Sequence, residues 1–269
     1  MRKALAIGFF VLLLIMPVFA QGPVNLLTNP GFEGAYNPQD NQGEIRVANG
    51  WRAFWSEGQR YVPGIDGGFN DHPTRRPEYN AALPGVDPYR IRSGQAAQHW
   101  FSFSGTSYAG VMQRVEGVQV GNTYQARAWL QGWCDNADGN THYCAPNVAY
   151  VSIGIDPDGG DWYGSRAIQW SQWQALTGGY LRYNSPPVVA NGTRVTVYIS
   201  VAFKWPLKHN DAYVDDAELV VLTSSPQPTP TPTPPPPTGD CLDAVQTETI
   251  FRRVLIDVLT RIGITISGG

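Results

Sequence analysis

Basic residues are in a minority in this chain, and charged residues of either sign are scarce. Of the 269 residues, 19 are Lys or Arg and 22 are Asp or Glu, which gives a formal net charge of -3 at neutral pH. A nucleic-acid-binding surface needs a basic face, so we expect no nucleic-acid partner.

Signatures of catalysis are also missing. The segment 105–110, G-T-S-Y-A-G, lacks the spacing of a nucleophile elbow, and the chain has no H-E-x-x-H metal motif and no glycine-rich phosphate loop. The four histidines are scattered along the sequence. We therefore expect a protein that is not an enzyme. A glycan-cleaving enzyme is the less favoured alternative, since glycoside hydrolysis needs only two carboxylates.

The one long hydrophobic run lies in residues 1–20. Arg2 and Lys3 precede an apolar stretch that ends at the small residue Ala20. This layout predicts a secretory signal peptide, and Pro17 makes the apolar stretch short for a membrane span. We expect a secreted, extracellular or cell-surface protein with no membrane span once the signal is removed. An uncleaved N-terminal anchor is the alternative.

Cysteine is rare, and its three positions fit an oxidising compartment. Cys134 and Cys144 flank a polar loop, which predicts a disulfide that closes this loop. Zinc binding with His142 as a third ligand is the rival interpretation, but no fourth ligand has the spacing that a tetrahedral site requires. Cys241 has no partner left in the chain, so we expect a free thiol or an intermolecular disulfide there.

Turn-forming and aromatic residues, in contrast, are abundant, with 29 Gly, 22 Pro and 12% aromatic residues. The clearest strands are residues 125–131, 148–155 and 194–203, in which apolar residues alternate with others at the period of a β-strand. Antiparallel strands of this kind stack face to face. The sequence therefore predicts an all-β domain over residues 21–223, built as a two-sheet antiparallel β-sandwich.

The side chains expected to point outward from these strands are more aromatic than a surface requires. Trp129, Tyr150 and Tyr198 lie on the side opposite the apolar set, together with Arg127 and Gln131. A sugar ring presents an apolar C–H face to aromatic planes and presents hydroxyls to planar polar groups. We interpret these five residues as a carbohydrate-binding face. The alternative is that the rings pack beneath loops.

Two loops are expected to border that face, because binding residues often lie on loops of a rigid scaffold. The acidic loop 155–162 ends in Trp162, and the loop 203–211 presents Trp205 and Asn210 just before the last strand. These three residues complete the predicted ligand-binding set.

Two adjacent carboxylates interrupt that last strand, in residues 210–222. Asp215 and Asp216 are poor strand formers, so they are expected to be neutralised by a partner. A cation shared with the turn at residues 29–33 is one candidate, since calcium prefers carboxylate and carbonyl oxygens. A solvated bulge is the other.

Six short motifs occur in an order that resembles a known family. They are N-L-L-T-N-P-G-F-E-G at 25–34, G-W at 50–51, S-G-Q-A-A at 93–97, V-G-N-T-Y-Q-A-R-A-W-L at 120–130, W-Q-A-L-T-G-G-Y at 173–180, and A-Y-V-D-D-A-E-L at 212–219. Over residues 25–222 this series resembles the jelly-roll carbohydrate-binding modules of the family 4, 9, 16 and 22 type, which have a galactose-binding-like fold.

The resemblance implies roles for several of the matching residues. It implies a structural calcium ion held by Glu33 and Asp216, with the carbonyl of Gly31 as a further donor. It also implies that Trp51 and Trp173 belong to the core.

A change of composition ends the domain. Residues 224–239 are rich in Pro and Thr and predict an extended linker. Residues 240–269 contain apolar residues at helical spacing and predict a short amphipathic helix. One such helix cannot bury its apolar face alone, so we expect it to pack on a partner, on a copy of itself or back on the sandwich. Self-association through this helix or through Cys241 is one of these alternatives.

These observations together predict a secreted, non-catalytic module that binds a polysaccharide or other glycan. An extracellular structural or adhesion protein that uses the same sandwich without binding sugar is the alternative.

Overall fold

The structure is a computed structural model that describes residues 24–85, 88–139 and 142–223, together with Thr249, Arg253 and Val254. The chain divides into two compact units, Met1–Ser225 and Pro226–Gly269. The predicted signal peptide, the linker and Cys241 lie outside the described residues. The three described residues of the second unit are helical. Among the residues described, no helix has the length and apolarity that a membrane crossing requires.

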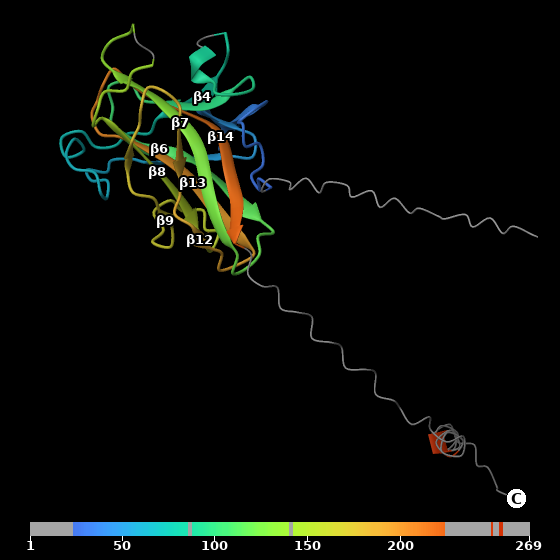
Figure 1. The fold of residues 1–269 in the computed structure, drawn as a ribbon. Coiled ribbons are helices and arrows are strands. Elements are labelled where there is room, and N and C mark those ends of the chain that lie inside the picture. The colour runs from blue at the N-terminus through green and yellow to red at the C-terminus, as the bar shows by residue number, and fades with distance from the viewer. Residues whose placement is uncertain (1–23, 86–87, 140–141, 224–248, 250–252, 255–269) are drawn as a thin grey trace, which may run out of the picture. The chain divides into compact units, whose positions relative to one another are not determined.

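The first unit contains two β-sheets, so the all-β, two-sheet prediction is confirmed (Figure 1). In strand order, the large sheet contains β1 (Tyr36–Gln39), β2 (Gln42–Ala48), β4 (Glu78–Ala82), β5 (Ala97–Phe101), β14 (His209–Thr223), β7 (Thr123–Asp135) and β11 (Leu181–Asn184), with β12 (Val188–Val189) also paired to β7. The small sheet contains β10 (Gln174–Ala175), β8 (Ala149–Asp156), β13 (Arg194–Phe203), β6 (Ser107–Glu116) and β3 (Arg52–Ser56), with β9 (Gln169–Trp170) on β8. The pairing is antiparallel except between β2 and β4.

The three strands expected from alternation are present. The predicted segment 125–131 lies within β7, the segment 148–155 matches β8 closely, and the segment 194–203 matches β13. In β13, however, both faces are buried, including Tyr198 and Ala202 on the face away from the core. Clusters of loop side chains cover that outer face, and Val62, Ile65 and Phe69 pack over Ala202.

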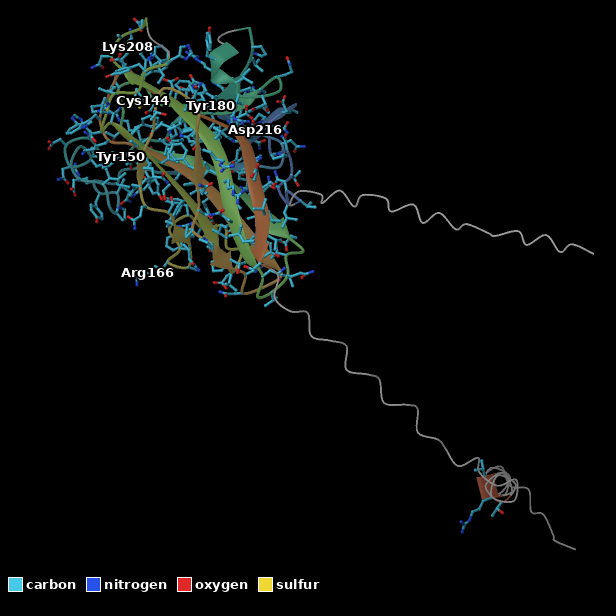
Figure 2. The ribbon with its side chains drawn as sticks, viewed as in Figure 1. Cys144, Tyr150, Arg166, Tyr180, Lys208 and Asp216 are labelled. Atoms are coloured by element: carbon cyan, nitrogen blue, oxygen red, sulfur yellow. A yellow bond between two sulfur atoms is a disulfide. The ribbon has the colours of Figure 1, made fainter. Side chains whose placement is uncertain are left out.

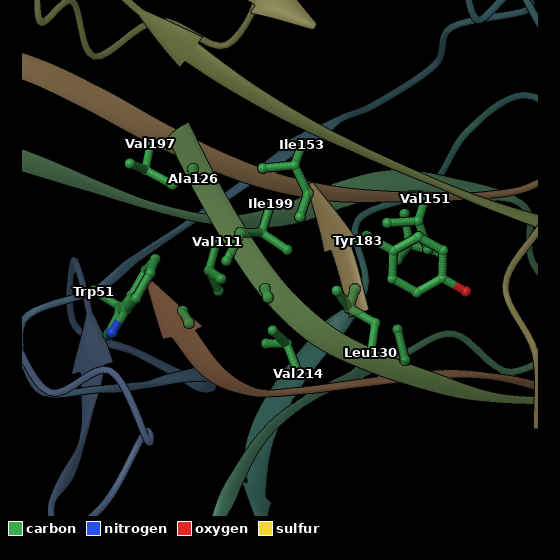
Figure 3. Close-up of a cluster of buried hydrophobic side chains, with 14 of the residues drawn as sticks. Trp51, Val111, Ala126, Leu130, Val151, Ile153, Tyr183, Val197, Ile199 and Val214 are labelled. Atoms are coloured by element: carbon green, nitrogen blue, oxygen red, sulfur yellow. The ribbon is translucent and has the colours of Figure 1, made fainter. Parts of the chain in front are cut away.

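Between the two sheets lies a hydrophobic core to which both contribute (Figure 3). Val111, Val151 and Ile199 from the small sheet meet Leu130 and Val214 from the large sheet. Alternate residues of each strand face inward because successive side chains in a strand point to opposite sides. This core fixes the position of both outer faces.

Trp51 closes one end of the core, as its predicted structural role requires. Its ring stacks on Phe32 at 4.6 Å between centroids, and its indole N–H donates to the Asn29 carbonyl at 2.9 Å. Trp51 is 5% exposed. Both its apolar body and its polar group are therefore satisfied, as burial of an indole requires.

The first described residues pair with the last strand. The backbone N–H of Leu26 donates to the Leu219 carbonyl at 3.0 Å, and the Ala217 N–H donates to the Pro30 carbonyl at 2.8 Å. The side chain of Asn25 adds one bond to the Ala217 carbonyl and accepts one from the Leu219 N–H. The two ends of the domain are thus joined side by side and antiparallel.

β14 continues through the two predicted interrupting carboxylates by means of a bulge. Its register on β7 shifts between Asp215 and Glu218, and Asp216 has a positive φ of 45°. Asp215 is fully buried, so the bulge is not simply solvated. Its carboxylate oxygen Oδ2 accepts the backbone N–H groups of Arg92 and Ser93 at 2.9 and 3.0 Å.

The predicted disulfide is confirmed. Cys134 and Cys144 are bonded, with an S–S distance of 2.03 Å. Backbone hydrogen bonds accompany it, since the Cys134 N–H donates to the Tyr143 carbonyl and the Ala145 N–H donates to the Cys134 carbonyl. The disulfide therefore fixes the base of a loop at the end of β7.

Candidate functional site

The five outward residues predicted to share one binding face lie on two opposite faces, and this part of the prediction is wrong. Arg127, Trp129 and Gln131 belong to β7 of the large sheet, whereas Tyr150 and Tyr198 belong to β8 and β13 of the small sheet. Strand alternation shows which side chains leave the core but not which sheet carries them. Two sets that both point away from a sandwich core therefore point away from each other.

The residues on β7 are engaged by neighbouring protein groups. Gln131 is 3% exposed, and its amide donates to the Tyr89 carbonyl at 2.7 Å. The Arg92 guanidinium lies over the ring of Trp129, 3.9 Å from the ring centroid. Arg127 donates to Gln125 at 3.1 Å. The loop that contains η1 (Pro88–Arg90) thus supplies groups that occupy the positions expected for ligand.

Tyr198 and Asn210 are buried, so their predicted direct contact with ligand is wrong. Both are 0% exposed. The Tyr198 hydroxyl donates to the Gly160 carbonyl at 2.8 Å. The Asn210 amide donates to the carbonyls of Gly105 and Trp205. The Tyr198 hydroxyl and the Asn210 amide N–H groups are thus paired with loop carbonyls, as buried donors require. Among the described residues, Asn210 Oδ1 is buried without a hydrogen-bond partner.

Tyr150 and Trp205, in contrast to Tyr198 and Asn210, are at least partly exposed. Tyr150 is half-buried and packs against the cluster over β13, on the opposite side of the body from Asp216 in the view of Figure 2. Trp205 is 41% exposed on the connection between β13 and β14, with the Lys204 ammonium 5.7 Å from its ring centroid. Neither residue lines the hollow described next.

The small sheet carries on its outer face a hollow of about 520 Å³, called here the aromatic hollow. Residues from the loop after β3 and from the segment after β8 form its walls, and residues of β3, β6 and β8 form its floor. Its lining consists of Ser56, Gln59, Tyr61, Pro63, Tyr108, Ser152, Trp162, Tyr163, Gly164, Ser165, Trp170, Ser171 and Trp173. Of the predicted ligand-binding residues, only Trp162 is in this set.

The rings of the aromatic hollow contact one another around Tyr108. The Tyr108 ring lies edge-on to Tyr163 at 6.0 Å and to Trp173 at 5.9 Å. Edge-to-face pairs of this kind hold ring planes at fixed angles. Tyr61 and Trp162 stand at the rim, 68% and 65% exposed. The hollow therefore combines fixed rings inside with exposed rings at its entrance.

Trp173 belongs to a wall of the aromatic hollow and not to the core, which corrects its predicted role. It is half-buried, and its indole N–H donates to the Pro63 carbonyl at 2.8 Å. This bond joins the loop after β3 to the segment before β10. Gly64 makes the approach possible, because a Cβ there would lie 3.0 Å from Trp173 Cδ1 and its φ of 81° suits glycine.

Trp170 lies against the small sheet at a glycine. A Cβ at Gly154 would lie 2.7 Å from Trp170 Cε3 and from Ile168 Cγ2, so only glycine leaves room for the indole. Tyr198 lies beneath at 5.8 Å between ring centroids. Tyr198 thus supports the hollow from below without lining it.

Among the described residues that line the aromatic hollow, none has a charged side chain. Burial, with a smaller contribution from neighbouring Tyr163, raises the pKa of the Tyr108 hydroxyl well above its ordinary value. Tyr108 therefore stays neutral across the physiological pH range. The hollow offers aromatic faces, hydroxyls, indole N–H groups and one amide, from Gln59.

Five of the residues that line the hollow were missed by the strand argument: Tyr61, Tyr108, Tyr163, Trp170 and Trp173. Four of them lie on loops or on the two-residue strand β9, where alternation carries no information. Their common signal is compositional, since Trp162, Tyr163, Trp170 and Trp173 fall within twelve residues of sequence. Such a density of aromatics in a loop exceeds what turns require.

The residues predicted to hold calcium lie close together at the β14 bulge. A Cβ at Gly31 would lie 3.7 Å from Glu33 Cγ and 3.9 Å from Asp216 Oδ1. Asp216 accepts the Ser93 hydroxyl at 2.8 Å and forms an ion pair with Arg92. These oxygens are of the type that calcium prefers.

Arg92 is therefore the group that would compete with a calcium ion for Asp216. Burial is the largest cause that raises the pKa of neighbouring Asp215, to about 6, while backbone N–H donors act in the opposite direction. Within the described part of the chain, no three His, Cys, Asp or Glu side chains are grouped for a metal ion. A calcium ion here would depend on backbone carbonyls, and it stays a prediction.

Comparisons with known proteins give structural likenesses alone. No family model matches the chain, and no curated protein matches its sequence. Similar solved structures include TmCBM61 in complex with β-1,4-galactotriose, at 15% identity over 74% of this chain and 99% of that one, with a TM-score of 0.45. The CBM22-1 xylan-binding domain of Paenibacillus barcinonensis Xyn10C is 12% identical over 77% of this chain and 100% of that one, with a TM-score of 0.40.

An enzyme chain is also among these structures. The apo form of a cyclase from Fischerella sp. is 12% identical over 75% of this chain and 97% of that one, with a TM-score of 0.44. All three likenesses lie below 25% identity and below a TM-score of 0.5, so they assign no function to this chain. The assignment of function therefore has to rest on the chemistry of the site.

Proposed function

We propose that the first unit is an exported, non-catalytic carbohydrate-binding module that binds a glycan in the aromatic hollow. The observation that carries the proposal is the set of six aromatic rings around a volume of about 520 Å³ on the outer face of a rigid sheet. Pockets for small ligands typically have volumes of about 300 to 1,000 Å³ and mostly apolar walls.

The chemistry of the lining suits a sugar. Aromatic planes stack on the apolar C–H face of a pyranose, and phenolic hydroxyls, indole N–H groups and an amide reach its edge. Exposed Tyr61 and Trp162 at the rim are large apolar side chains that a purely structural surface would not need.

The absence of carboxylates from this lining supports binding over hydrolysis at the hollow. Glycoside hydrolysis uses a pair of Asp or Glu residues on either side of the scissile bond. Export is supported by the predicted signal peptide and by the disulfide between Cys134 and Cys144, since disulfides persist in oxidising compartments.

Two exposed tryptophans allow a matched test of the site. Trp162→Ala removes a ring from the hollow, and Trp205→Ala removes one outside it. We expect Trp162→Ala to weaken binding about tenfold or more, since an apolar ring contact contributes about 1.5 to 3 kcal/mol. Trp205→Ala should bind as wild type does. The measurement is retardation of the purified protein in native gels that contain soluble galactan, xylan or β-glucan.

Each other outcome has a defined meaning. If no polysaccharide on these gels or on a glycan array retains the wild-type protein, the proposed function is wrong and the structural or adhesion alternative gains support. Equal losses from Trp162→Ala and Trp205→Ala would reject the hollow as the site. Release of reducing sugar by the wild-type protein would show an enzyme.

A further inference from the structure

The aromatic hollow is unevenly equipped for hydrogen bonding. Among the residues that the structure describes, the indole N–H groups of Trp162 and Trp170 have no hydrogen-bond partner, and neither do the hydroxyls of Tyr61, Tyr108 and Tyr163. An indole N–H can only donate. The hollow therefore presents free donors to a ligand.

Most of its serine hydroxyls, in contrast, are already engaged. Ser56 Oγ donates to Thr74 Oγ1 at 3.1 Å. Ser152 Oγ donates to the Ser171 carbonyl at 3.0 Å, while Ser171 Oγ accepts the Ile153 N–H at 3.1 Å. Ser56 and Ser152 are also only 2% and 1% exposed, so their oxygens are out of reach of a ligand, and Ser165 Oγ accepts the Ala167 N–H at 3.1 Å. Among the side chains that line the hollow, the acceptors left to a ligand are therefore mainly the Gln59 amide oxygen and the phenolic oxygens, and none is a carboxylate.

This balance is a poor match for an unsubstituted sugar and a good match for an acetylated one. Each sugar hydroxyl brings a donor that needs an acceptor, and carboxylates are the strong acceptors that this hollow lacks. An acetyl group brings a carbonyl oxygen, which only accepts, and a methyl group that packs on aromatic rings. It adds no donor when it replaces the hydrogen of a hydroxyl.

We propose that the aromatic hollow selects neutral glycans that carry acetyl groups, as O-acetyl esters or as 2-acetamido groups, over the same glycans without them. The inference rests on the proposed function and specifies its ligand class. It is carried by the unpaired indole donors, the buried hydroxyls of Ser56 and Ser152, and the absence of carboxylates among the residues that line this apolar site.

Trp170 is the residue best placed to distinguish the two ligands. Its ring is half-buried and fixed between Gly154 and Tyr198, so its N–H group has a defined position. A donor that becomes enclosed by a ligand without an acceptor loses its hydration, and this loss weakens binding. A ligand carbonyl that accepts a hydrogen bond from the Trp170 N–H replaces the lost water and removes this penalty.

Two ligand pairs test the proposal by titration calorimetry on the full chain. The first pair is a chito-oligosaccharide and a cello-oligosaccharide of equal length, which share the β-1,4 backbone and differ at the 2-position. The second is acetylated xylan and the same xylan after alkaline deacetylation. We expect the acetylated member to bind about five- to tenfold more tightly in at least one pair, the value of one hydrogen bond, and that pair identifies the acetyl linkage.

The failures of the two proposals are distinct. If the unsubstituted members bind as tightly as the acetylated ones, the selectivity is disproved while glycan binding stands. If no member of either pair binds, the ligand class is wrong, and if the polysaccharide gels are also negative, the proposed function fails with it.

A variant at Trp170 tests the indole N–H separately from the aromatic ring. Trp170→Phe keeps an aromatic ring and removes the N–H group, so it should lower the affinity for the acetylated ligand more than the affinity for the plain one and reduce the preference between them. Trp205→Phe, outside the hollow, should keep the full preference. A Trp170→Phe protein that keeps the full preference, with a wild-type melting temperature, would contradict the role assigned to this indole.

Discussion

Tyr198 shows at the scale of a residue how an outward side chain becomes structural. Strand alternation sends it away from the central core, yet it lies beneath Trp170 and beside Phe54, with centroids 5.6 Å apart, and is fully buried. Its hydroxyl donates to the Gly160 carbonyl. Tyr198 therefore belongs to a second core formed between the small sheet and the loops over it.

We predict that Tyr198→Ala lowers the free energy of unfolding by about 3 to 5 kcal/mol, the usual cost of removing a buried aromatic ring. Tyr198→Phe should cost only about 1 kcal/mol, the value of one hydrogen bond. Urea unfolding measures both. If Tyr198→Ala melts as wild type does, the ring is not packed as described, and the second core is wrong.

At the scale of an element, the bulge in β14 and the loop after η1 form one unit. The loop brings the Arg92 guanidinium, the Ser93 hydroxyl and three backbone N–H groups to the carboxylates of Glu33, Asp215 and Asp216. The carboxylates of Glu33 and Asp216 with one cation, Arg92, leave an excess of negative charge, to which Asp215 adds when it is ionised. A divalent cation would balance that excess.

We predict that calcium binds at this bulge and stabilises the domain. Addition of a chelator should lower the melting temperature by several degrees, since a ligand at a hundredfold excess over its Kd contributes about 2.7 kcal/mol. Calcium should restore it. Elemental analysis of the purified protein is the independent measurement.

A variant separates calcium binding from general effects of the chelator. Glu33→Gln keeps a carbonyl that accepts the Gln95 N–H and removes one charge, so this protein should respond less to chelator. A wild-type melting temperature that is the same with and without chelator, in protein without bound calcium, would leave Arg92 as the only counter-charge at Asp216.

The two-sheet fold was predictable because it depends on the alternation of apolar and other residues along each strand. This alternation is clear in the sequences of β7, β8 and β13. The binding site was not, because it depends on loops whose residues are brought together by tertiary contacts. Trp162 was found because it ends a turn-rich acidic loop, whereas Trp173 was assigned to the core by resemblance and lies in a wall of the hollow. The disulfide was predictable because Cys144 follows Cys134 by only ten positions, across a polar loop.

At the scale of the whole molecule, the first unit contains every part of the hollow and of the core. The compact unit Met1–Ser225 includes all strands of both sheets. We predict that a chain that ends at Ser225 keeps the melting temperature and the glycan affinity of the full chain, because a domain with its own core folds alone. Calorimetry on both chains checks this. Loss of either property on truncation would show that residues 226–269 stabilise the body.

The antiparallel pairing between the N-terminal segment and β14 also determines how the body responds to mechanical force. Residues 24 and 223 lie at the open end of this pair, so a pull between them loads its hydrogen bonds one after another, as in a zipper, beginning near Leu26 and Leu219. The next hydrogen bond to break is the one between the Ala217 N–H and the Pro30 carbonyl, beside the acidic bulge. There the loop after η1 bridges the N-terminal segment and β14, because Arg92 and Ser93 contact Asp216 and the Gln95 N–H donates to Glu33. The force needed to separate the N-terminal segment from β14 should therefore rise at this point. The aromatic hollow lies on the other sheet, outside this path, so we expect a body pulled at these two residues to lose the pairing of its first residues before the hollow is disrupted.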